Sequence, residues 1–273
     1  MKFEKKISDF IINWLINYNS DNKMKGFVVG VSGGVDSALT SSLCAMTGLP
    51  LLCLEMDIYQ KKEEKTRAIN HIKNLKKKFT NVEFKSIELS STFDVFQKSV
   101  GGQSENHNHL HSLANTRSRL RMVTLYYYAS IYNYLVVGTG NKVEDFGVGF
   151  YTKYGDGGVD LSPIADLMKS EVFKVAKYLG VSNDILNAQP TDGLWSDSRT
   201  DKDQIGASYD ELEWAMSIED RDKYNPKSKR EVELLEIYDK FNTINKHKML
   251  PIPICHIPRK FKSLIKNDKH NIY

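Results

Sequence analysis

Residues 27–46 contain the feature that most constrains the fold, because an apolar run, a turn of small residues and a helix follow one another without a gap. The run at residues 27–31 is rich in valine, as buried parallel strands are. Apolar residues then recur at helical spacing from Leu39 to Met46, and Gly48 follows as a stop signal. The sequence therefore predicts a strand–loop–helix unit, the building block of α/β sheets.

The turn, Ser-Gly-Gly-Val-Asp-Ser at residues 32–37, has the composition of an anion-binding loop. Gly33 and Gly34 let backbone N–H groups approach an anion, and the start of the helix adds unpaired donors. Asp36 can hold Mg²⁺ against bound phosphates. No Gly-Lys-Ser/Thr follows the glycines, so this is not a Walker A loop. The alternative, a glycine turn that serves only helix–strand packing, stays open at this point.

Composition is typical of a globular protein and limits the partners of the chain. Its 273 residues predict a single domain over residues 1–273, with a C-terminal arm from about residue 246. The hydrophobic share of 41% and the charged share of 26% are ordinary for such a fold. A formal charge of +4 suits an anionic nucleotide but is too small to indicate nucleic-acid binding.

The cysteines and the N-terminus bear on location. Cys44, Cys53 and Cys255 lie far apart without a pairing pattern, which indicates thiols in a reducing compartment. Residues 1–19 predict an amphipathic helix rather than a signal sequence. No apolar run approaches the roughly 20 residues that span a bilayer. We therefore expect a cytoplasmic protein without membrane contact.

Strand and helix signals alternate along the chain. Besides residues 27–31, apolar runs predict strands at 49–56, 82–89 and 134–139. Helical spacing of apolar residues predicts helices at 1–19, 37–46, 63–79, 106–133, 168–179, 209–218 and 230–245. This rhythm predicts an α/β fold with a doubly wound parallel sheet and helices on both faces. Ligands bind such sheets beyond the carboxyl ends of the strands, where the loop would lie.

The helix predicted at residues 106–133 is apolar on more than one side and contains consecutive tyrosines from Tyr126 to Tyr128. Its own sheet can cover only one of these sides. A second copy of the chain is the simplest cover, so we expect a homodimer. His107 and His111 lie one turn apart in this helix, but a zinc site needs further ligands, and we expect exposed histidines instead.

Two carboxylates and one lysine are candidates for chemistry. Glu144 follows the strand predicted at 134–139, so it meets Asp36 at one edge of the sheet if their strands are neighbours. Lys169 lies near the start of a helix, where the dipole disfavours a cation and an anionic ligand would relieve that cost. Residues 187–204 are polar with little periodicity, and we interpret them as a mobile lid over the site.

Further stretches carry a specific resemblance, in the same order over nearly the whole chain. They are the loop at 32–37, Asn115 with Arg119 and Arg121, Gly138 and Thr139 with Glu144, residues 150–160, residues 190–192, residues 205–211, and His247 with Lys248. In this pattern the chain resembles the NAD synthetase family in its short, ammonia-dependent form, within the ATP pyrophosphatase superfamily. The Thr-Lys-Tyr-Gly-Asp-Gly-Gly run is the most specific part. The segment from Glu144 to Lys153 is slightly longer than in some relatives.

The resemblance implies an adenine nucleotide alpha hydrolase-like fold and a role for each matching residue. The ATP-binding residues would be Gly30, Val31, Ser32, Gly33, Gly34, Val35, Asp36, Ser37, Thr139, Lys169 and Thr191. The deamido-NAD-binding residues would be Arg119, Lys153, Asp156, Asp160, His247 and Lys248. Asp36 and Glu144 would bind Mg²⁺, and Asp36 and Lys169 would be catalytic. In that family the dinucleotide lies across a dimer interface.

The implied reaction is an ATP-driven amidation. The nicotinate carboxylate of deamido-NAD attacks the α-phosphorus of ATP, because oxide is too poor a leaving group for direct attack by ammonia. Pyrophosphate leaves into the loop, and ammonia then converts the acyl adenylate into NAD with release of AMP. No cysteine lies in a recognisable glutaminase setting, so free ammonia is the expected nitrogen donor.

Two other functions are compatible with the loop alone. A tRNA-modifying enzyme of the same superfamily would need sulfur-carrying or cluster-binding cysteines and a basic extension, and the sequence shows neither. A non-catalytic nucleotide sensor would not require a pair of carboxylates such as Asp36 and Glu144.

Overall fold

The computed structural model describes residues 2–101, 106–191, 193, 200–221 and 223–262. Within these ranges the centre is a parallel four-stranded sheet in the order β3-β2-β1-β4. Its strands are β1 (Phe27–Gly30), β2 (Leu51–Asp57), β3 (Val82–Glu88) and β4 (Leu135–Val136). Because β1 lies between β2 and β4, the loops that leave β1 and β4 open side by side, at the point where the strand order reverses.

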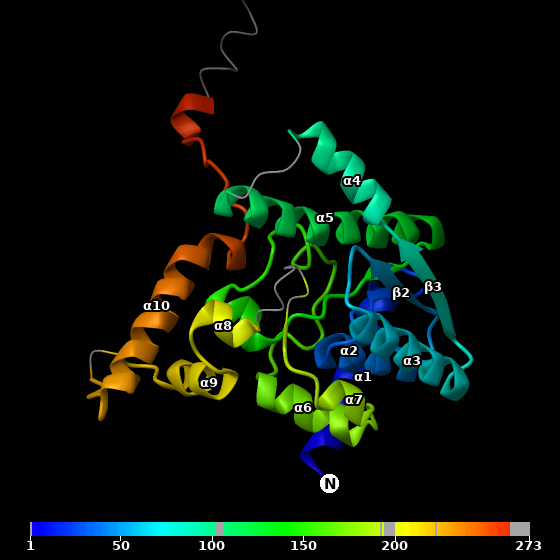
Figure 1. The fold of residues 1–273 in the computed structure, drawn as a ribbon, viewed down its shortest axis with the longest axis horizontal. Coiled ribbons are helices and arrows are strands. Elements are labelled where there is room, and N and C mark those ends of the chain that lie inside the picture. The colour runs from blue at the N-terminus through cyan, green and yellow to red at the C-terminus, as the bar shows by residue number, and fades with distance from the viewer. Residues whose placement is uncertain (1, 102–105, 192, 194–199, 222, 263–273) are drawn as a thin grey trace, which may run out of the picture.

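Helices cover both faces of this sheet (Figure 1). The helical elements are α1 (Phe3–Asp21), α2 (Val35–Met46), α3 (Lys62–Lys78), α4 (Ser90–Ser99), α5 (His107–Tyr132), η1 (Lys142–Val148), α6 (Lys169–Tyr178), α7 (Asn183–Leu186), α8 (Asp201–Ile205), α9 (Tyr209–Ser217) and α10 (Lys229–Met249). The element η1 is a π-helix, which is uncommon and is often found near functional sites. The predicted doubly wound α/β fold is confirmed.

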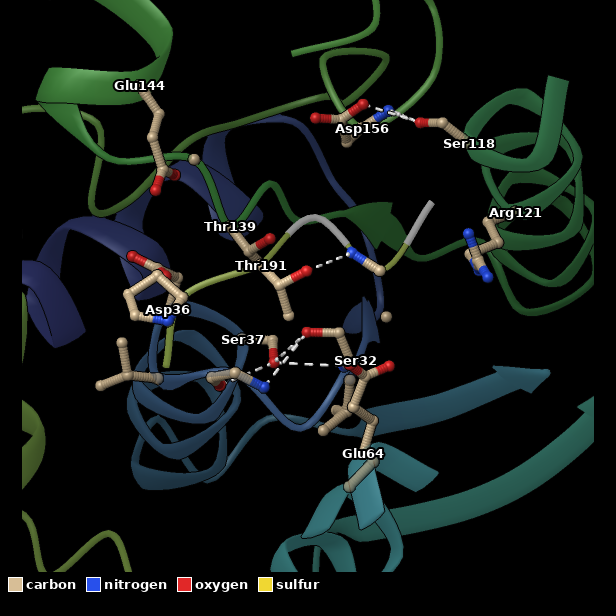
Figure 2. Close-up of a pocket in the computed structure, with 18 of the residues that line it drawn as sticks. Ser32, Asp36, Ser37, Glu64, Ser118, Arg121, Thr139, Glu144, Asp156 and Thr191 are labelled. Atoms are coloured by element: carbon tan, nitrogen blue, oxygen red, sulfur yellow. Dashed lines mark hydrogen bonds between the residues drawn. The ribbon is translucent and has the colours of Figure 1, made fainter. Parts of the chain in front are cut away.

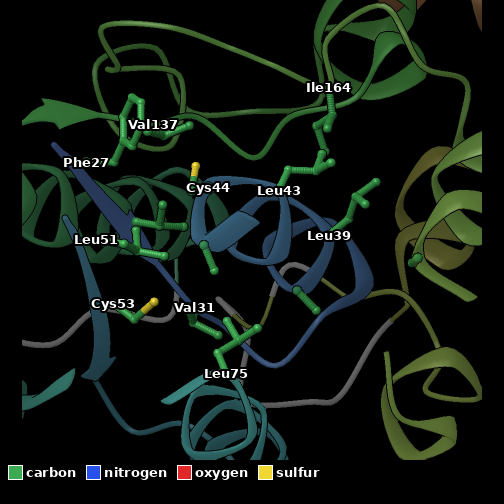
Figure 3. Close-up of a cluster of buried hydrophobic side chains, with 14 of the residues drawn as sticks. Phe27, Val31, Leu39, Leu43, Cys44, Leu51, Cys53, Leu75, Val137 and Ile164 are labelled. Atoms are coloured by element: carbon green, nitrogen blue, oxygen red, sulfur yellow. The ribbon is translucent and has the colours of Figure 1, made fainter. Parts of the chain in front are cut away.

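Successive residues of β1 face opposite sides of the sheet, as the pleat requires. Phe27 and Val29 pack with α1, α2, α3 and α6 in the main core, which Figure 3 shows. Val28 points to the other face, where Ala129 and the tyrosines of α5 cover it. Every residue of β1 except Gly30 is buried, which explains the continuous apolar run in the sequence.

The elements η1, α8, α9 and α10 form a third cluster beside the sheet. Its buried residues include Val143, Val148, Ile205, Leu212 and Leu234. Helix α10 runs along this flank in orange in Figure 1. This cluster carries Glu144 on η1, so it positions one of the two candidate carboxylates independently of the main core.

Several predicted boundaries differ from the structure. The fourth strand is shorter than the predicted 134–139, because Gly138 leaves β1 and donates its N–H to Leu161 O at 2.8 Å. Helix α10 continues to Met249, beyond the predicted start of the C-terminal arm at about residue 246. Helices α4, α7 and α8 and the π-helix η1 were not predicted, since α7 and α8 are too short for a periodic apolar pattern.

The segment predicted as a lid is only partly described. Residues 192 and 194–199 lie outside the described ranges, and helix α8 forms at its C-terminal end. The lid therefore stays a prediction. No helix in the described ranges is long and apolar enough to cross a membrane.

Candidate active site

The loop between β1 and α2 is closed by two serine side chains. Ser37 Oγ donates to Gly34 O at 3.1 Å and accepts from the backbone N–H of Ser32 at 3.2 Å. The hydroxyls of Ser32 and Ser37 lie 3.2 Å apart. These bonds hold the loop in a tight turn around the start of α2, where backbone N–H groups have no helical acceptor.

Gly33 is required in this turn for two reasons. Its φ of +87° lies in the left-handed region, which a side chain disfavours. A Cβ atom built on it would come within 2.5 Å of Glu64 O on α3. Arg67 of the same helix donates its Nε to Gly33 O at 3.3 Å. The loop is therefore pressed against α3, so packing alone already requires a glycine at this position.

Lys169 joins the two candidate carboxylates. Its Nζ lies 2.6 Å from Asp36 Oδ2 and 2.8 Å from Glu144 Oε1. The lysine side chain is 4% exposed and each carboxylate side chain 17%. Asp36 comes from the first turn of α2, Glu144 from η1 after β4, and Lys169 from the start of α6. The neighbouring strands β1 and β4 thus bring together what the sequence places more than 100 residues apart.

The electrostatics of this trio follow from its burial. Burial disfavours the charge on Lys169, but the carboxylates of Asp36 and Glu144 more than offset this, so the pKa of Lys169 is raised above its usual value. Burial and the nearby Glu144 raise the pKa of Asp36 above that of an ordinary aspartate. A further positive charge beside this group would therefore stabilise both carboxylates.

A cavity of about 290 Å³ opens in front of the loop. Figure 2 shows Asp36 and Glu144 on one side of it and Arg121 on the other, with Ser32 and Ser37 between them. The predicted ATP and metal residues that line it are Gly30, Val31, Ser32, Gly34, Val35, Asp36, Ser37, Thr139, Glu144, Lys169 and Thr191. Segments from four distant parts of the chain therefore meet at one cavity.

A second group of predicted residues lies where α5, the loop after η1 and the end of α10 meet. Arg119 donates to Lys153 O at 3.3 Å, and Lys153 Nζ donates to His247 O at 2.7 Å. Lys248 Nζ donates to Gly149 O at 2.8 Å and to Tyr151 O at 2.9 Å. The four predicted basic residues are thus brought together, but the Nζ atoms of both lysines bind backbone carbonyls.

The two remaining predicted residues, Asp156 and Asp160, differ in position. Asp156 lines the cavity, and its Oδ1 accepts from Ser118 Oγ at 2.7 Å and from Thr152 N at 2.9 Å. Asp160 Oδ2 accepts from Val136 N at 2.8 Å, and its Oδ1 accepts from Tyr126 at 3.0 Å. Asp160 therefore ties β4 to α5, whereas Asp156 faces the space where a ligand would bind.

Asn141 and Tyr209 contact the trio but were not predicted to do so. Asn141 is fully buried and donates its Nδ2 to Asp36 Oδ1 at 3.0 Å. Its Oδ1 accepts from Val143 N and Glu144 N, so it also caps the start of η1. An asparagine that precedes two acidic residues after a strand is a helix-start signal that could have identified it. Tyr209 contacts Glu144 through its hydroxyl, and no local pattern predicts that.

The histidines at the start of α5 form a stacked pair. The rings of His107 and His111 lie 6.4 Å apart and nearly parallel. Among the described residues, no group of three or more His, Cys, Asp or Glu side chains is arranged to hold a metal ion. The pair lies at the end of α5 that carries Asn115, whose side-chain amide contacts His111 at 3.3 Å.

Known proteins resemble this chain over most of its length. The family model of NAD synthase matches residues 7–250. An NH(3)-dependent NAD(+) synthetase from Archaeoglobus fulgidus is 38% identical over 245 residues, which cover 86% of this chain and 93% of that protein.

Solved structures of similar proteins match the fold of this chain. The NMN synthetase from Francisella tularensis has a TM-score of 0.82 and 31% identity, over 94% of this chain and 100% of that one. An NH3-dependent NAD synthetase from Campylobacter jejuni, solved in complex with the nitrate ion, has a TM-score of 0.73 and 27% identity, over 94% and 100%. Because the family model matches residues 7–250 and a named relative is 38% identical over 86% of this chain, the chain belongs to the NAD synthase family, a family of ligases.

Proposed function

We propose that this chain is an ammonia-dependent NAD synthetase that adenylates the nicotinate carboxylate of deamido-NAD and then amidates it. The observation that carries the proposal is the placement of Lys169 between Asp36 and Glu144 at the mouth of the phosphate loop. Its support from relatives is the identity of 38% to a protein named for this activity. A pure nucleotide sensor has no need of this buried trio.

Asp36 and Glu144 fit the Mg²⁺ that this reaction requires. The Lys169 ammonium shows that one cationic centre can lie within 2.8 Å of an oxygen of each carboxylate. Mg²⁺ prefers one or two carboxylates completed by phosphate oxygens and water, and both carboxylates line the cavity beside the loop. When bound there, the metal would neutralise negative charge on the phosphates of ATP.

The residues of the loop and Lys169 have separate tasks in the proposed reaction. The backbone N–H groups of residues 32–37 bind the β- and γ-phosphates, which leave together as pyrophosphate. Lys169 lines the same cavity, and its ammonium would offset the negative charge that develops on the phosphates as the carboxylate oxygen forms a bond to phosphorus. Thr139 and Thr191 complete the wall on which ATP would lie. Ammonia then attacks the acyl carbon, and AMP leaves with its electron pair.

The second substrate would bind along the far wall. Asp156 faces the cavity and suits a ribose hydroxyl of deamido-NAD. Arg119, Lys153 and Lys248 gather with His247 where α5, the loop after η1 and the end of α10 meet. The positive charges of the arginine and the two lysines would attract the dinucleotide phosphates. Asp160 would support the site indirectly, because its carboxylate accepts a hydrogen bond from Val136 N of β4.

A homodimer is part of the proposal. Val123, Tyr127 and Ile131 recur every four residues on α5 and are 58%, 62% and 56% exposed. An apolar stripe of this kind on a helix is typical of a covered interface. We further propose that the chain works as one synthetase domain in the cytoplasm, where its three unpaired cysteines remain thiols.

The test is an assay with purified protein, ATP, Mg²⁺, deamido-NAD and ammonium. NAD, AMP and pyrophosphate should form in equal amounts. Glutamine in place of ammonium should give little product, and strong synthesis from glutamine would contradict the proposed nitrogen donor. Release of ADP instead of AMP would contradict adenylation.

A second candidate is an NMN synthetase, which carries out the same chemistry on the mononucleotide. The observation in its favour is the TM-score of 0.82 to the Francisella tularensis enzyme of that name. Nicotinate mononucleotide lacks the AMP half of deamido-NAD but carries the same nicotinate carboxylate. The two substrates would therefore compete for the same reaction site. Comparison of kcat/KM for the two substrates decides between the candidates.

A further inference from the structure

Helix α9 contacts the lysine–carboxylate trio through Tyr209, its first residue. The Tyr209 hydroxyl is hydrogen-bonded to Glu144 Oε1, and it lies 2.7 Å from Asp201 Oδ2 on α8. The ring centroid of Tyr209 lies 4.7 Å from Lys169 Nζ, within the range of a cation–π contact. One side chain therefore touches both the carboxylate and the ammonium of the trio, which are 17% and 4% exposed.

Glu213 acts on the same trio from behind. Its Oε1 accepts from Ser170 N and its Oε2 from Ser170 Oγ, both at 2.7 Å. Ser170 follows Lys169 in the first turn of α6, where N–H groups have no helical acceptor. A carboxylate at this place caps the helix and fixes the backbone from which Lys169 projects.

Tyr209 and Glu213 are four residues apart and so share one face of α9. That helix is anchored independently of the trio. Ser208 and Glu211 form a capping box at its start. Arg230 of α10 donates to Glu211 Oε1 at 2.8 Å and to Glu211 Oε2 at 3.0 Å. The position of α9, whose face touches Lys169 and Glu144, is thus fixed by bonds outside the trio.

We infer that Tyr209 and Glu213 are positioning residues that hold the Glu144 carboxylate and the Lys169 ammonium in a fixed alignment for the metal–nucleotide complex. The inference rests on the proposed function for the meaning of the trio. Without the Tyr209 hydroxyl, Glu144 Oε1 loses one of its hydrogen-bond donors, so the carboxylate is free to rotate away from the orientation in which it lines the cavity. Glu144 would then be less available to a divalent cation.

The test uses Tyr209→Phe, which keeps the ring under Lys169 and removes only the hydroxyl. Loss of an outer hydrogen bond to a metal ligand typically weakens metal binding by about 10- to 100-fold. We expect the Mn²⁺ affinity of the variant, measured by electron paramagnetic resonance with ATP present, to fall by at least about 10-fold. The kcat should fall with little change in KM for the amidated substrate. Glu213→Gln should lower kcat with a smaller change in Mn²⁺ affinity, because it acts on Lys169 only.

Tyr224→Phe is the matched control. Its hydroxyl donates to Glu231 at 3.0 Å, so the substitution removes the same type of bond away from the trio. This variant should keep wild-type Mn²⁺ affinity and kcat. Thermal unfolding midpoints of all variants show whether a lower activity comes from loss of the fold or from displacement of Glu144 and Lys169. If Tyr209→Phe folds and binds Mn²⁺ as tightly as the wild type, the inference is wrong.

The two proposals fail in different ways. A wild-type protein that makes no NAD or NMN overturns the proposed function, whereas the Mn²⁺ measurement still tests Tyr209. If the wild type makes NAD and Tyr209→Phe binds Mn²⁺ as tightly as the wild type, only the inference about Tyr209 is wrong.

Discussion

The phosphate loop and the segment that carries Glu144 lie side by side but are held in different ways. Val31 and Val35 of the loop are 3% and 5% exposed, and Gly33 is pressed against the backbone of α3. Packing and backbone shape therefore hold the loop. The segment from Asn141 to Lys153 also packs, through Val143 and Val148, but in addition side chains of another helix donate to its carbonyl groups.

Helix α10 supplies the donors for that segment. Asn242 donates to Gly147 O and Asn245 to Val148 O, both at 2.8 Å. Lys248, three residues further on, donates to Gly149 O. A π-helix that ends here leaves carbonyl groups without helical donors, and one face of α10 provides them in sequence. A loop held by packing tolerates few side chains, whereas a segment held by hydrogen bonds depends on partners remote in the sequence.

The largest effect is expected where the two regions meet, at Lys169. In Lys169→Met the carboxylates of Asp36 and Glu144 face each other without the ammonium, which is destabilising by about 3–5 kcal/mol for a buried pair. The kcat should fall by about 100- to 1,000-fold because a charge-stabilising donor is lost. Urea unfolding and steady-state kinetics measure the two effects.

Lys142→Met controls for the loss of a lysine–carboxylate pair. Lys142 pairs with Asp166 at 2.9 Å, but the side chains are 40% and 96% exposed. The cost should be below about 1 kcal/mol. An equal loss of stability in both variants would contradict the role of burial in the trio.

The next largest effect concerns the packing of the loop. Gly33→Ala combines a positive φ with a contact of 2.5 Å to Glu64 O, and strain of this kind costs about 1–3 kcal/mol from the backbone alone. We expect lower stability and a higher KM for ATP. Gly48→Ala also has a positive φ, of +75°, but its Cβ meets nothing within 4 Å. The difference in unfolding free energy between the two variants measures the clash, and equal values would show that α3 does not constrain the loop.

The sequence predicted the packed region well, for a physical reason. The valines of β1, the glycines of the turn and the apolar stripe of α2 are neighbours in the chain, so their pattern is local. The match of α5, from His107 to Tyr132, with the predicted 106–133 follows from the same principle. The prediction that Asp36 and Glu144 meet also assumed that the strands before them are neighbours. The pairing of β1 with β4 confirms that assumption.

The hydrogen-bonded region could not be predicted from local patterns. The bond from Asn245 to Val148 O joins residues 97 positions apart, and nothing in either stretch indicates the other. The π-helix η1 replaces a predicted turn, and no local pattern in its sequence indicates this uncommon geometry. The bonds of Tyr209 to Glu144 and of Asn141 to Asp36 have the same non-local origin.

The two regions should also differ in their response to acid. His71 of α3 is buried against Ser41 of α2, with Nε2 2.9 Å from Oγ, and burial followed by repulsion from Lys78 lowers its pKa to about 4. The unfolded chain binds a proton near pH 6.5, so this stabilisation is complete above pH 6.5 and is lost as pH falls toward 4. The loss is on the order of 3 kcal/mol.

His71→Gln should flatten the dependence of stability on pH between 6.5 and 4, measured by urea unfolding at a series of pH values. The exposed His256→Gln is the control for removal of a histidine. In the other region, hydrogen bonds from Arg230 lower the pKa of Glu211 to about 2, so its stabilisation is lost only as pH falls below about 4.5. Solvent exposure limits this second effect to about 1 kcal/mol. A slope unchanged in His71→Gln would contradict its burial in the neutral form.

The smallest effect concerns the asparagines of α10. Asn245→Ala removes one side-chain bond to a carbonyl and should cost about 1 kcal/mol. Asn22→Ala removes a similar bond, to Tyr18 O at 2.8 Å, from the exposed end of α1 and gives the reference value. Because Gly147 and Val148 are consecutive in one π-turn, loss of Asn242 and Asn245 together should differ from the sum of the single losses by at least about 0.5 kcal/mol. A purely additive pair would mean that each carbonyl is held separately, and that α10 does not fix the segment carrying Glu144 as a unit.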